Sequence, residues 1–263
     1  MAYKLNWLEQ VLLDAGLKVA PVQGWLDRGH GDMGELMGVM CHHTAGPPNG
    51  NMPSLDTVIS GRPDLSGPLA QLALGRDGGY YVVAAGRCYH AGEGIWQGIR
   101  YGNSCFIGIE AENTGRPDDP WPPVQIDAYQ RGVAALLKRL QRNTLYCVGH
   151  KEYATPKGRK PDPAGIDMDA FRRKVGAILD GTAPAPVLIP RFEQLADGNQ
   201  GRPTVRRGAS GSLVEIVQTR LQIFSDGLFG SQTEAAVRTF QRSKNLVPDG
   251  IIGPKTWQAL GPL

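Results

Sequence analysis

The stretch LMGVMCHH at residues 36–43 decides the fold class, because a short apolar run that ends in polar side chains is typical of a buried strand. Two further runs have this character, YYVVAA at 80–85 and CFIGIEAE at 105–112. Apolar residues at helical spacing cover 125–142 and 167–180. Strands that alternate with helices predict an α/β (α+β) domain with a mixed central sheet flanked by helices.

The bulk composition predicts two domains in one soluble chain. The 263 residues, 41% of them hydrophobic and 20% charged, suffice for one medium domain and a smaller second unit. From residue 182 to 203 the periodicity is lost and prolines and glycines accumulate, which is typical of a semi-rigid linker. We therefore predict a first domain over 1–181, a linker over 182–203 and a second domain over 204–263.

The second domain contains an internal repeat. DGLFGSQT at 226–233 returns, 23 residues later, as DGIIGPKT at 249–256. In each copy Asp-Gly forms a tight turn, an apolar residue fills the core, and Ser231 or Pro254 begins a helix. The preceding segment 212–224 is expected to place four apolar residues on one helical face: Leu213, Ile216, Val217 and Leu221. The sequence predicts a small all-α domain of three helices.

Charge, hydropathy and cysteine spacing exclude several classes of protein. The formal net charge is +3, with 9 basic and 6 acidic residues in 185–263, and no basic stripe with interleaved aromatics indicates nucleic-acid binding. No apolar run is long enough for membrane insertion, and residues 1–19 read as an amphipathic helix rather than a secretion signal. The four cysteines lack C-x-x-C spacing, so we expect buried free thiols rather than a zinc knuckle or redox pair.

The histidines indicate a site in the first domain. Four of the five histidines of the chain lie in CHHTAG (41–46), YHAGEG (89–94) and VGHKEY (148–153). His42 ends a predicted strand, His150 follows a short one, and Asp162 lies in GRKPDP (158–163), where prolines on both sides hold it on a stiff segment. Two histidines and a carboxylate suffice for a hydrolytic zinc centre whose fourth position is kept for water.

These strings, together with SCFIGIEAENTG (104–115), resemble the zinc amidase family that includes phage lysozyme-type amidases, muropeptide-recycling amidases and peptidoglycan recognition proteins. The resemblance spans roughly 35–180. It implies Zn2+ bound by His42, His150 and Asp162, with Glu110 and Lys160 as catalytic partners. Some members of the family carry Cys in place of Asp162, and the lytic branch often places Tyr at a catalytic position.

The resemblance also implies roles for these side chains. Glu110 would act as general base and then acid, Lys160 would stabilise the oxyanion, and zinc would activate water and polarise the carbonyl. Glu112 points to the same face of the strand as Glu110 and competes with it for the role of base. His90 is expected to line the substrate groove, and Asn113 is a further candidate for binding the glycan.

The C-terminal stretch resembles the peptidoglycan-binding module of wall hydrolases. The resemblance covers about 206–260 and rests on GASGSLVEIVQTRL, the two Asp-Gly elements and AVRTFQ at 236–241. Taken together, the two resemblances imply an N-acetylmuramoyl-L-alanine amidase similar to endolysins, which degrades bacterial peptidoglycan. We expect a monomer made in the bacterial cytoplasm without a signal peptide, acting at the cell wall or periplasm after release.

Two other functions are compatible with parts of the sequence. A peptidoglycan recognition protein that binds without cleaving shares the family resemblance, but such relatives lose a metal ligand, and all three candidates are present here. A glycosidase needs two carboxylates flanking the bond, and Glu110 with Glu112 on one strand face is a poor arrangement for it. The sequence therefore favours the amidase.

Overall fold

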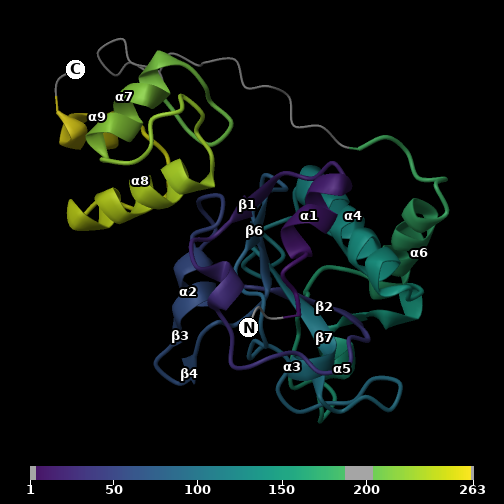
Figure 1. Ribbon diagram of the computed structural model, residues 1–263. Coiled ribbons are helices and arrows are strands. Elements are labelled where there is room, and N and C mark those ends of the chain that lie inside the picture. Colours follow the sequence, from purple (N-terminus) through teal and green to yellow (C-terminus); the bar gives the residue numbers. More distant parts are fainter. Residues whose placement is uncertain (1–3, 187–203, 262–263) are drawn as a thin grey trace. The chain divides into compact units, whose positions relative to one another are not determined.

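The computed structural model describes residues 4–186 and 204–261 of the protein. The chain divides into two compact units, the first with helices α1 to α6 and the sheet, the second with α7 to α9 (Figure 1). Most of the predicted linker, residues 187–203, lies outside the described residues.

A six-stranded mixed sheet forms the centre of the first unit. Its order is β1-β6-β5-β7-β2-β8, and every neighbouring pair is parallel except β5 with β6. The strands are β1 (Val19–Pro21), β2 (Gly38–His43), β5 (Leu72–Leu74), β6 (Tyr80–Val82), β7 (Phe106–Ala111) and β8 (Cys147–Gly149). The fold class predicted from the sequence is confirmed, since a mixed sheet lies between helices.

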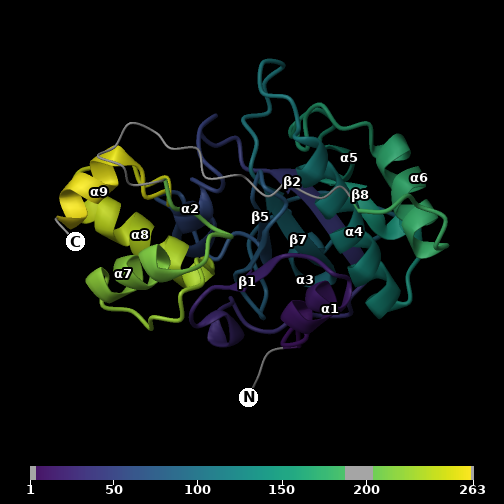
Figure 2. The same ribbon diagram turned by 90° about the horizontal axis from the view of Figure 1, so that it is seen from above.

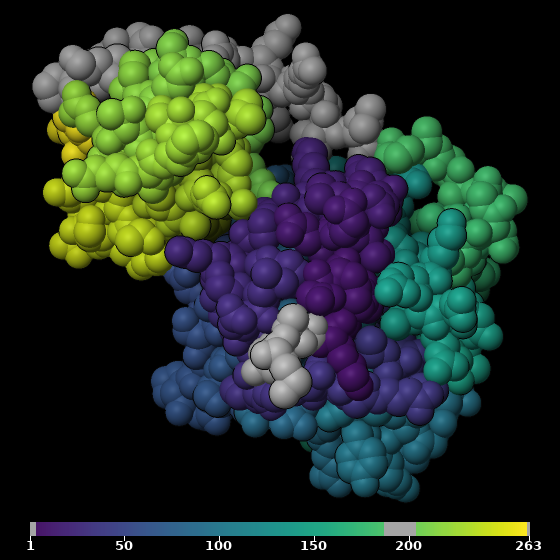
Figure 3. All heavy atoms as spheres, in the orientation of Figure 1, coloured from purple at the N-terminus to yellow at the C-terminus, as the bar shows by residue number. Residues whose placement is uncertain are grey.

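Helices cover both faces of this sheet. Figure 2 shows α2 (Leu55–Ser60) on one side and α4 (Pro123–Leu140) with α6 (Met168–Leu179) on the other. The first helix, α1 (Leu8–Asp14), packs beside α4 and is visible on the surface in Figure 3. The short elements are η1 (Trp25–Asp27), β3 (Gly61–Arg62), β4 (Leu65–Ser66), α3 (Gly102–Cys105), η2 (Thr144–Tyr146) and α5 (His150–Tyr153).

Alternation along β2 divides its side chains between the two faces of the sheet. Val39 and Cys41 belong to the large core beneath α1, α4 and α6, whereas Met40 belongs to a smaller core on the opposite face. His42 follows Met40 by two residues and therefore points to this opposite face. The strand thus contributes its first half to the core and its carboxyl end to a site.

Over residues 204–261 the second unit contains three helices, as predicted: α7 (Ser212–Arg220), α8 (Ser231–Ser243) and α9 (Pro254–Leu260). Phe229 and Ile252, the apolar residues of the two repeats, are buried in its core. The predicted apolar face of α7 is wrong in one respect, because Val214, Val217 and Gln218 are its buried residues, and Ile216 is half-buried. Gln218 takes a core position because its side chain binds the first Asp-Gly turn.

Two further expectations concern membranes and thiols. Within the parts of the chain that the structure describes, no helix has both the length and the apolar character to cross a bilayer. All four cysteines are free; Cys41, Cys88 and Cys147 are buried as expected, whereas Cys105 is partly exposed. The Sγ atoms of Cys41 and Cys147 lie 3.9 Å apart between β2 and β8.

Candidate active site

Two adjacent parallel strands bring His42 and Glu110 together. These residues are register partners on β2 and β7, so their side chains leave the same face of the sheet at its carboxyl edge. Tyr129 of α4 supports both strand ends from the other face. Its hydroxyl accepts a hydrogen bond from the His42 N–H at 2.9 Å and lies 3.1 Å from the carbonyl oxygens of both His42 and Ile109.

His150 and Asp162 reach the site from two later segments. His150 begins α5 directly after β8, which pairs with β2. The loop that carries Asp162 is fastened to the same helix by Lys151, whose N–H donates to the Asp162 carbonyl at 2.7 Å. The Lys151 ammonium donates to the carbonyl oxygens of Pro163 at 3.0 Å and Ile166 at 2.6 Å. The position of Asp162 is therefore set by contacts of Lys151 with the backbone of Asp162 and of the residues that follow it.

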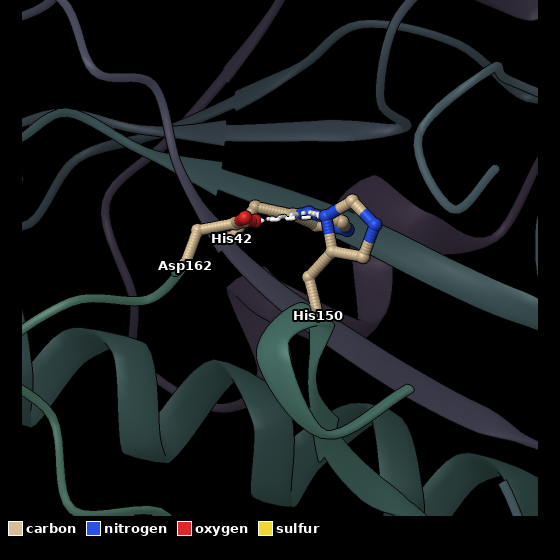
Figure 4. Close-up of side chains that lie close together, drawn as sticks. All are labelled: His42, His150 and Asp162. Atoms are coloured by element: carbon tan, nitrogen blue, oxygen red, sulfur yellow. Dashed lines mark hydrogen bonds and ion pairs between the residues drawn. The ribbon is translucent and has the colours of Figure 1, made fainter. Parts of the chain in front are cut away.

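His42, His150 and Asp162 converge on one point (Figure 4). Nδ1 of His42 lies 3.1 Å from Nδ1 of His150 and 2.9 Å from Oδ2 of Asp162, and the last two atoms are 2.9 Å apart. Within residues 4–186 and 204–261 this is the group of His, Cys, Asp and Glu side chains with the geometry to hold a metal ion. All three residues are buried.

The outward hydrogen bonds of the two imidazoles determine where their protons lie. His90 Nε2 is 3.2 Å from the Phe106 carbonyl oxygen, which can only accept, so the proton of His90 is on Nε2. Its Nδ1 then accepts from Nε2 of His42 at 3.1 Å. Nε2 of His150 donates to the Ala91 carbonyl at 2.8 Å. When His42 and His150 are neutral, the Nδ1 atom of each therefore carries a lone pair. The Nε2 atom of each donates a hydrogen bond that orients the ring, as is usual for histidines that bind metals.

The electrostatics of this cluster favour a bound cation. Burial is the main reason that the pKa of His42 is lowered to about 4, so its ring is neutral at pH 7. Two nitrogen lone pairs and a carboxylate thus lie 2.9–3.1 Å apart, and a cation removes the repulsion between them.

Glu110 is the carboxyl group beside the cluster that has proton-transfer character. Burial raises its pKa to about 8, the charges of Asp162 and Glu112 add to this shift, and Lys160 opposes it. Its Oε2 is buried and has no hydrogen-bond partner among the residues that the structure describes. Lys160, which is partly exposed, also lowers the pKa of His42, so its charge acts on both groups. A carboxyl that titrates near neutral pH is suited to accept and return a proton.

Glu112 has a different environment from Glu110. It is fully buried, and its carboxylate accepts hydrogen bonds from the Thr44 hydroxyl at 2.7 Å, the Ser54 N–H at 2.9 Å and the Ser54 hydroxyl at 3.0 Å. Burial raises its pKa and these hydrogen bonds lower it. With these donors bound to it, Glu112 fastens the loop from residue 44 to residue 54.

The two residues expected to contact substrate lie at different depths. His90 is 8% exposed and orients His42, as described above. Asn113 is 1% exposed, and its amide is engaged at both ends, donating to the Asp119 carbonyl at 3.1 Å and accepting from the Gly115 N–H at 2.8 Å. Both contacts lie within one loop, so the Asn113 side chain supports that loop. A substrate contact by either residue stays a prediction.

Comparison with known sequences assigns the first unit to a protein family. The N-acetylmuramoyl-L-alanine amidase family matches residues 33–165, which contain Glu110 and the cluster of His42, His150 and Asp162. The chain belongs to this amidase family. A second match, to a putative peptidoglycan binding domain, covers residues 210–260 of the helical unit.

Individual relatives of this amidase-family chain are distant. The N-acetylmuramoyl-L-alanine amidase CwlL of Bacillus licheniformis is 29% identical over 143 residues, 50% of this chain and 38% of CwlL. A zinc D-Ala-D-Ala carboxypeptidase of Streptomyces albus G is 38% identical over 117 residues, 38% of this chain and 45% of that protein. The chain thus spans less than half the length of each. Among solved structures, an AmpD derivative is 24% identical with a TM-score of 0.47, covering 66% of this chain and 98% of that one.

The structure adds supporting contacts that the sequence did not indicate. Tyr129 lies in α4, where the sequence pattern indicates only a helix, yet its hydroxyl joins the ends of β2 and β7. Gly108 is needed because a Cβ there would lie 2.8 Å from the ring of His90. The side-chain oxygen of Asn103 accepts hydrogen bonds from the N–H groups of His90 at 2.9 Å and Ala91 at 2.7 Å. It thereby holds the segment that orients His42 and His150. The strand and loop positions alone gave no signal for these contacts.

Proposed function

We infer that the chain hydrolyses the amide bond between N-acetylmuramic acid and the L-alanine of the peptidoglycan stem, with Zn2+ held by His42, His150 and Asp162. The observation that carries this proposal is the convergence of two imidazole lone pairs and a carboxylate oxygen within 3.1 Å. This nitrogen and oxygen donor set suits zinc in a hydrolytic site with three protein ligands. Membership in the amidase family supports the identity of the bond.

The residues of the chain supply the rest of the chemistry. When bound, zinc provides Lewis acidity toward a carbonyl and lowers the pKa of water to about 7. Glu110 holds the proton taken from the attacking water at its carboxyl and returns it to the leaving amine. Lys160, two residues from Asp162, stabilises the negative charge that develops on the carbonyl oxygen. His90 keeps the proton of His42 on Nε2, so that Nδ1 stays available to the metal.

The helical unit supports a role in attachment to the wall. We propose residues 1–181 as the catalytic domain, 182–203 as the linker and 204–263 as a peptidoglycan-binding domain, so that one substrate polymer is held by two parts of the chain. The match of residues 210–260 to a putative peptidoglycan binding domain supports this division. Tethering raises the local concentration of catalytic domain at the polymer. This arrangement suits a lytic, endolysin-like enzyme that acts at the bacterial cell wall.

A recognition protein that binds peptidoglycan without cleaving it is the second candidate. It is less favoured, because such a protein needs neither a complete set of metal donors nor a carboxyl group of raised pKa beside it. Here both features are present, in the cluster and in Glu110.

Mass spectrometry of digested sacculi tests the proposal. Purified sacculi are incubated with the full chain, with and without a zinc chelator. The expected result is release of stem peptides with free alanine amino termini, abolished by chelator and restored by zinc. New reducing sugar ends would contradict the amidase and indicate a glycosidase. Binding of the chain to sacculi without any released peptide would favour the recognition protein.

A further inference from the structure

The two Asp-Gly turns of the helical unit are built on the same hydrogen bonds. In each, a buried glutamine amide donates to the Asp carboxylate, to a carbonyl two residues after the Asp, and to a threonine hydroxyl, at 2.6–3.0 Å in the first turn and 2.7–3.1 Å in the second. The same glutamine accepts from the N–H of the turn glycine at 2.9 Å in both. The matching sets are Gln218, Asp226, Leu228 and Thr233, then Gln241, Asp249, Ile251 and Thr256.

Both turns form with the same hydrogen bonds, so the exposed residues that differ between the two repeats are not needed to form the turns. Beside the first turn a pocket of about 400 Å³ opens along α7, lined by Glu215, Ile216, Thr219, Arg220 and Ser225. In the second repeat, 23 residues later in the sequence, Arg238 is the residue equivalent to Glu215. Arg238 is 3% exposed and forms a buried ion pair with Glu234 at 2.8 Å. A carboxylate that faces a pocket in one repeat is thus replaced by a buried cation in the other.

The polar groups of the pocket mainly accept hydrogen bonds. The hydroxyls of Thr219 and Ser225 both donate to the Glu215 carbonyl, at 2.8 Å and 3.1 Å, which leaves their oxygen lone pairs for a ligand. The Glu215 carboxylate can only accept. Arg220 is held at one side by donation to the Leu260 carbonyl at 3.0 Å. A ligand that fits this lining brings several hydrogen-bond donors.

The chain next to this lining carries an exposed aromatic side chain. Phe224 directly precedes Ser225 and is 80% exposed, and Leu228 in the same turn is 59% exposed. Val247 occupies the position of Phe224 in the second repeat and is 75% exposed, so both repeats expose an apolar residue but only the first has a flat ring there. The negative face of an aromatic ring attracts the positive edge of C–H bonds. A pyranose ring presents such bonds on its face and hydroxyl donors around its rim.

We propose that the pocket lined by Glu215, Thr219 and Ser225, together with Phe224 next to it in the chain, binds the N-acetylated amino sugars of the glycan strand, an assignment that rests on the proposed peptidoglycan substrate. The sugar face stacks on Phe224, and sugar hydroxyl and amide protons bind Glu215, Thr219 and Ser225. The second turn keeps the framework but lacks both the ring and the carboxylate. The helical unit therefore holds the sugar chain, whereas the catalytic unit acts on the bond to the peptide.

A titration of the full chain tests this site with a ligand that the catalytic unit cannot cleave. The probe is a β-1,4-linked tetrasaccharide of N-acetylglucosamine, followed through the NMR amide shifts of Thr219 and Ser225. Phe224→Ala is expected to weaken binding about tenfold, as truncation of an aromatic anchor does. Val247→Ala is the matched control, an equally exposed apolar residue in the other repeat, and is expected to leave affinity unchanged.

Three further outcomes separate the explanations. Equal affinity in Phe224→Ala and wild type, with unchanged thermal midpoints, would overturn the site. Shifts at Thr219 and Ser225 with free stem peptide and none with the tetrasaccharide would overturn the sugar as occupant. Release of stem peptides from sacculi is measured on the same samples: its absence in wild type would contradict the proposed function, whereas its presence together with an insensitive Phe224→Ala would contradict this inference alone.

Discussion

The cluster of His42, His150 and Asp162 and the two Asp-Gly turns are both networks of buried polar groups. The residues that interact within them lie at very different distances along the chain. His42 meets His150 and Asp162 across 108 and 120 residues, whereas Gln218 meets its partners within 15 residues. The first network exists only when β2, β7 and β8 pair in register. The second forms between one helix, the turn that follows it and the first turn of the next helix. The candidate metal ligands are thus brought together by contacts between distant segments, whereas the Asp-Gly turns are held by residues close in the sequence.

Removal of Asp162 should have the largest effect, because the cluster has three ligand atoms, each from a different segment of the chain. In Asp162→Ala the two imidazoles lose the anionic ligand, and zinc affinity is expected to fall by more than about 100-fold, since loss of an outer-shell partner alone costs about 10–100-fold. Amide hydrolysis should fall to the level of the chelator-treated protein. Metal content after dialysis and a muropeptide assay measure both. Asp118→Ala, at an exposed position, is the control, and full metal retention in Asp162→Ala would contradict the assignment.

Substitution of the two neighbouring glutamates separates catalysis from support. Glu110→Gln should keep zinc bound and lower kcat by about 10²–10⁴-fold, the usual contribution of a general acid or base. Glu112→Gln places an amide where three hydrogen bonds are accepted and should destabilise the fold by about 1–3 kcal/mol, with kcat of the folded protein nearly unchanged. Steady-state kinetics, metal analysis and thermal unfolding measure these effects. A larger loss of kcat in Glu112→Gln would reverse the two roles.

The pH dependence of stability tests the environment of Glu110. Its pKa of about 8 in the folded chain lies above the value of about 4.3 in an unfolded chain, so the folded state keeps a proton that the unfolded state releases. The free energy of unfolding of the chelator-treated protein should therefore fall as pH rises from 4.3 to 8, by about 1.4 kcal/mol at most for each unit. Glu110→Gln removes this contribution. Denaturant titrations at pH 5 and pH 8 measure it, and parallel losses in both proteins would contradict it.

Matched substitutions in the repeats should give the smallest effect and the most local one. Gln218→Ala and Gln241→Ala each leave buried partners unpaired, so each should cost about 1–3 kcal/mol of stability in the helical unit. Hydrogen exchange of residues 204–261 measures the loss, with exposed Gln232→Ala as control. Stem-peptide release from a soluble muropeptide should be unchanged. Clearly unequal losses in the two variants would show that the repeats are not equivalent frameworks.

Much of the fold was predictable because the strongest patterns were local. The helices predicted at 125–142 and 167–180 correspond to α4 and α6, since each has a long apolar face at helical spacing. The Asp-Gly repeat located both turns of the second unit. The expectation for Ile216 was wrong because spacing alone cannot tell that Gln218, a polar residue, is needed in the core to bind a turn.

The sequence by itself determined the candidate metal ligands, the mixed sheet and the three-helix unit, because residue type, strand periodicity and turn chemistry are properties of short segments. Only the tertiary structure decided which glutamate faces the cluster and where the imidazole protons lie. Glu110 lies on β7, and Glu112 follows the end of that strand. The contacts of Glu112 with Thr44 and Ser54 come from a distant loop. Proton positions depend on the Phe106 and Ala91 carbonyls, whose approach to His90 and His150 is a result of folding.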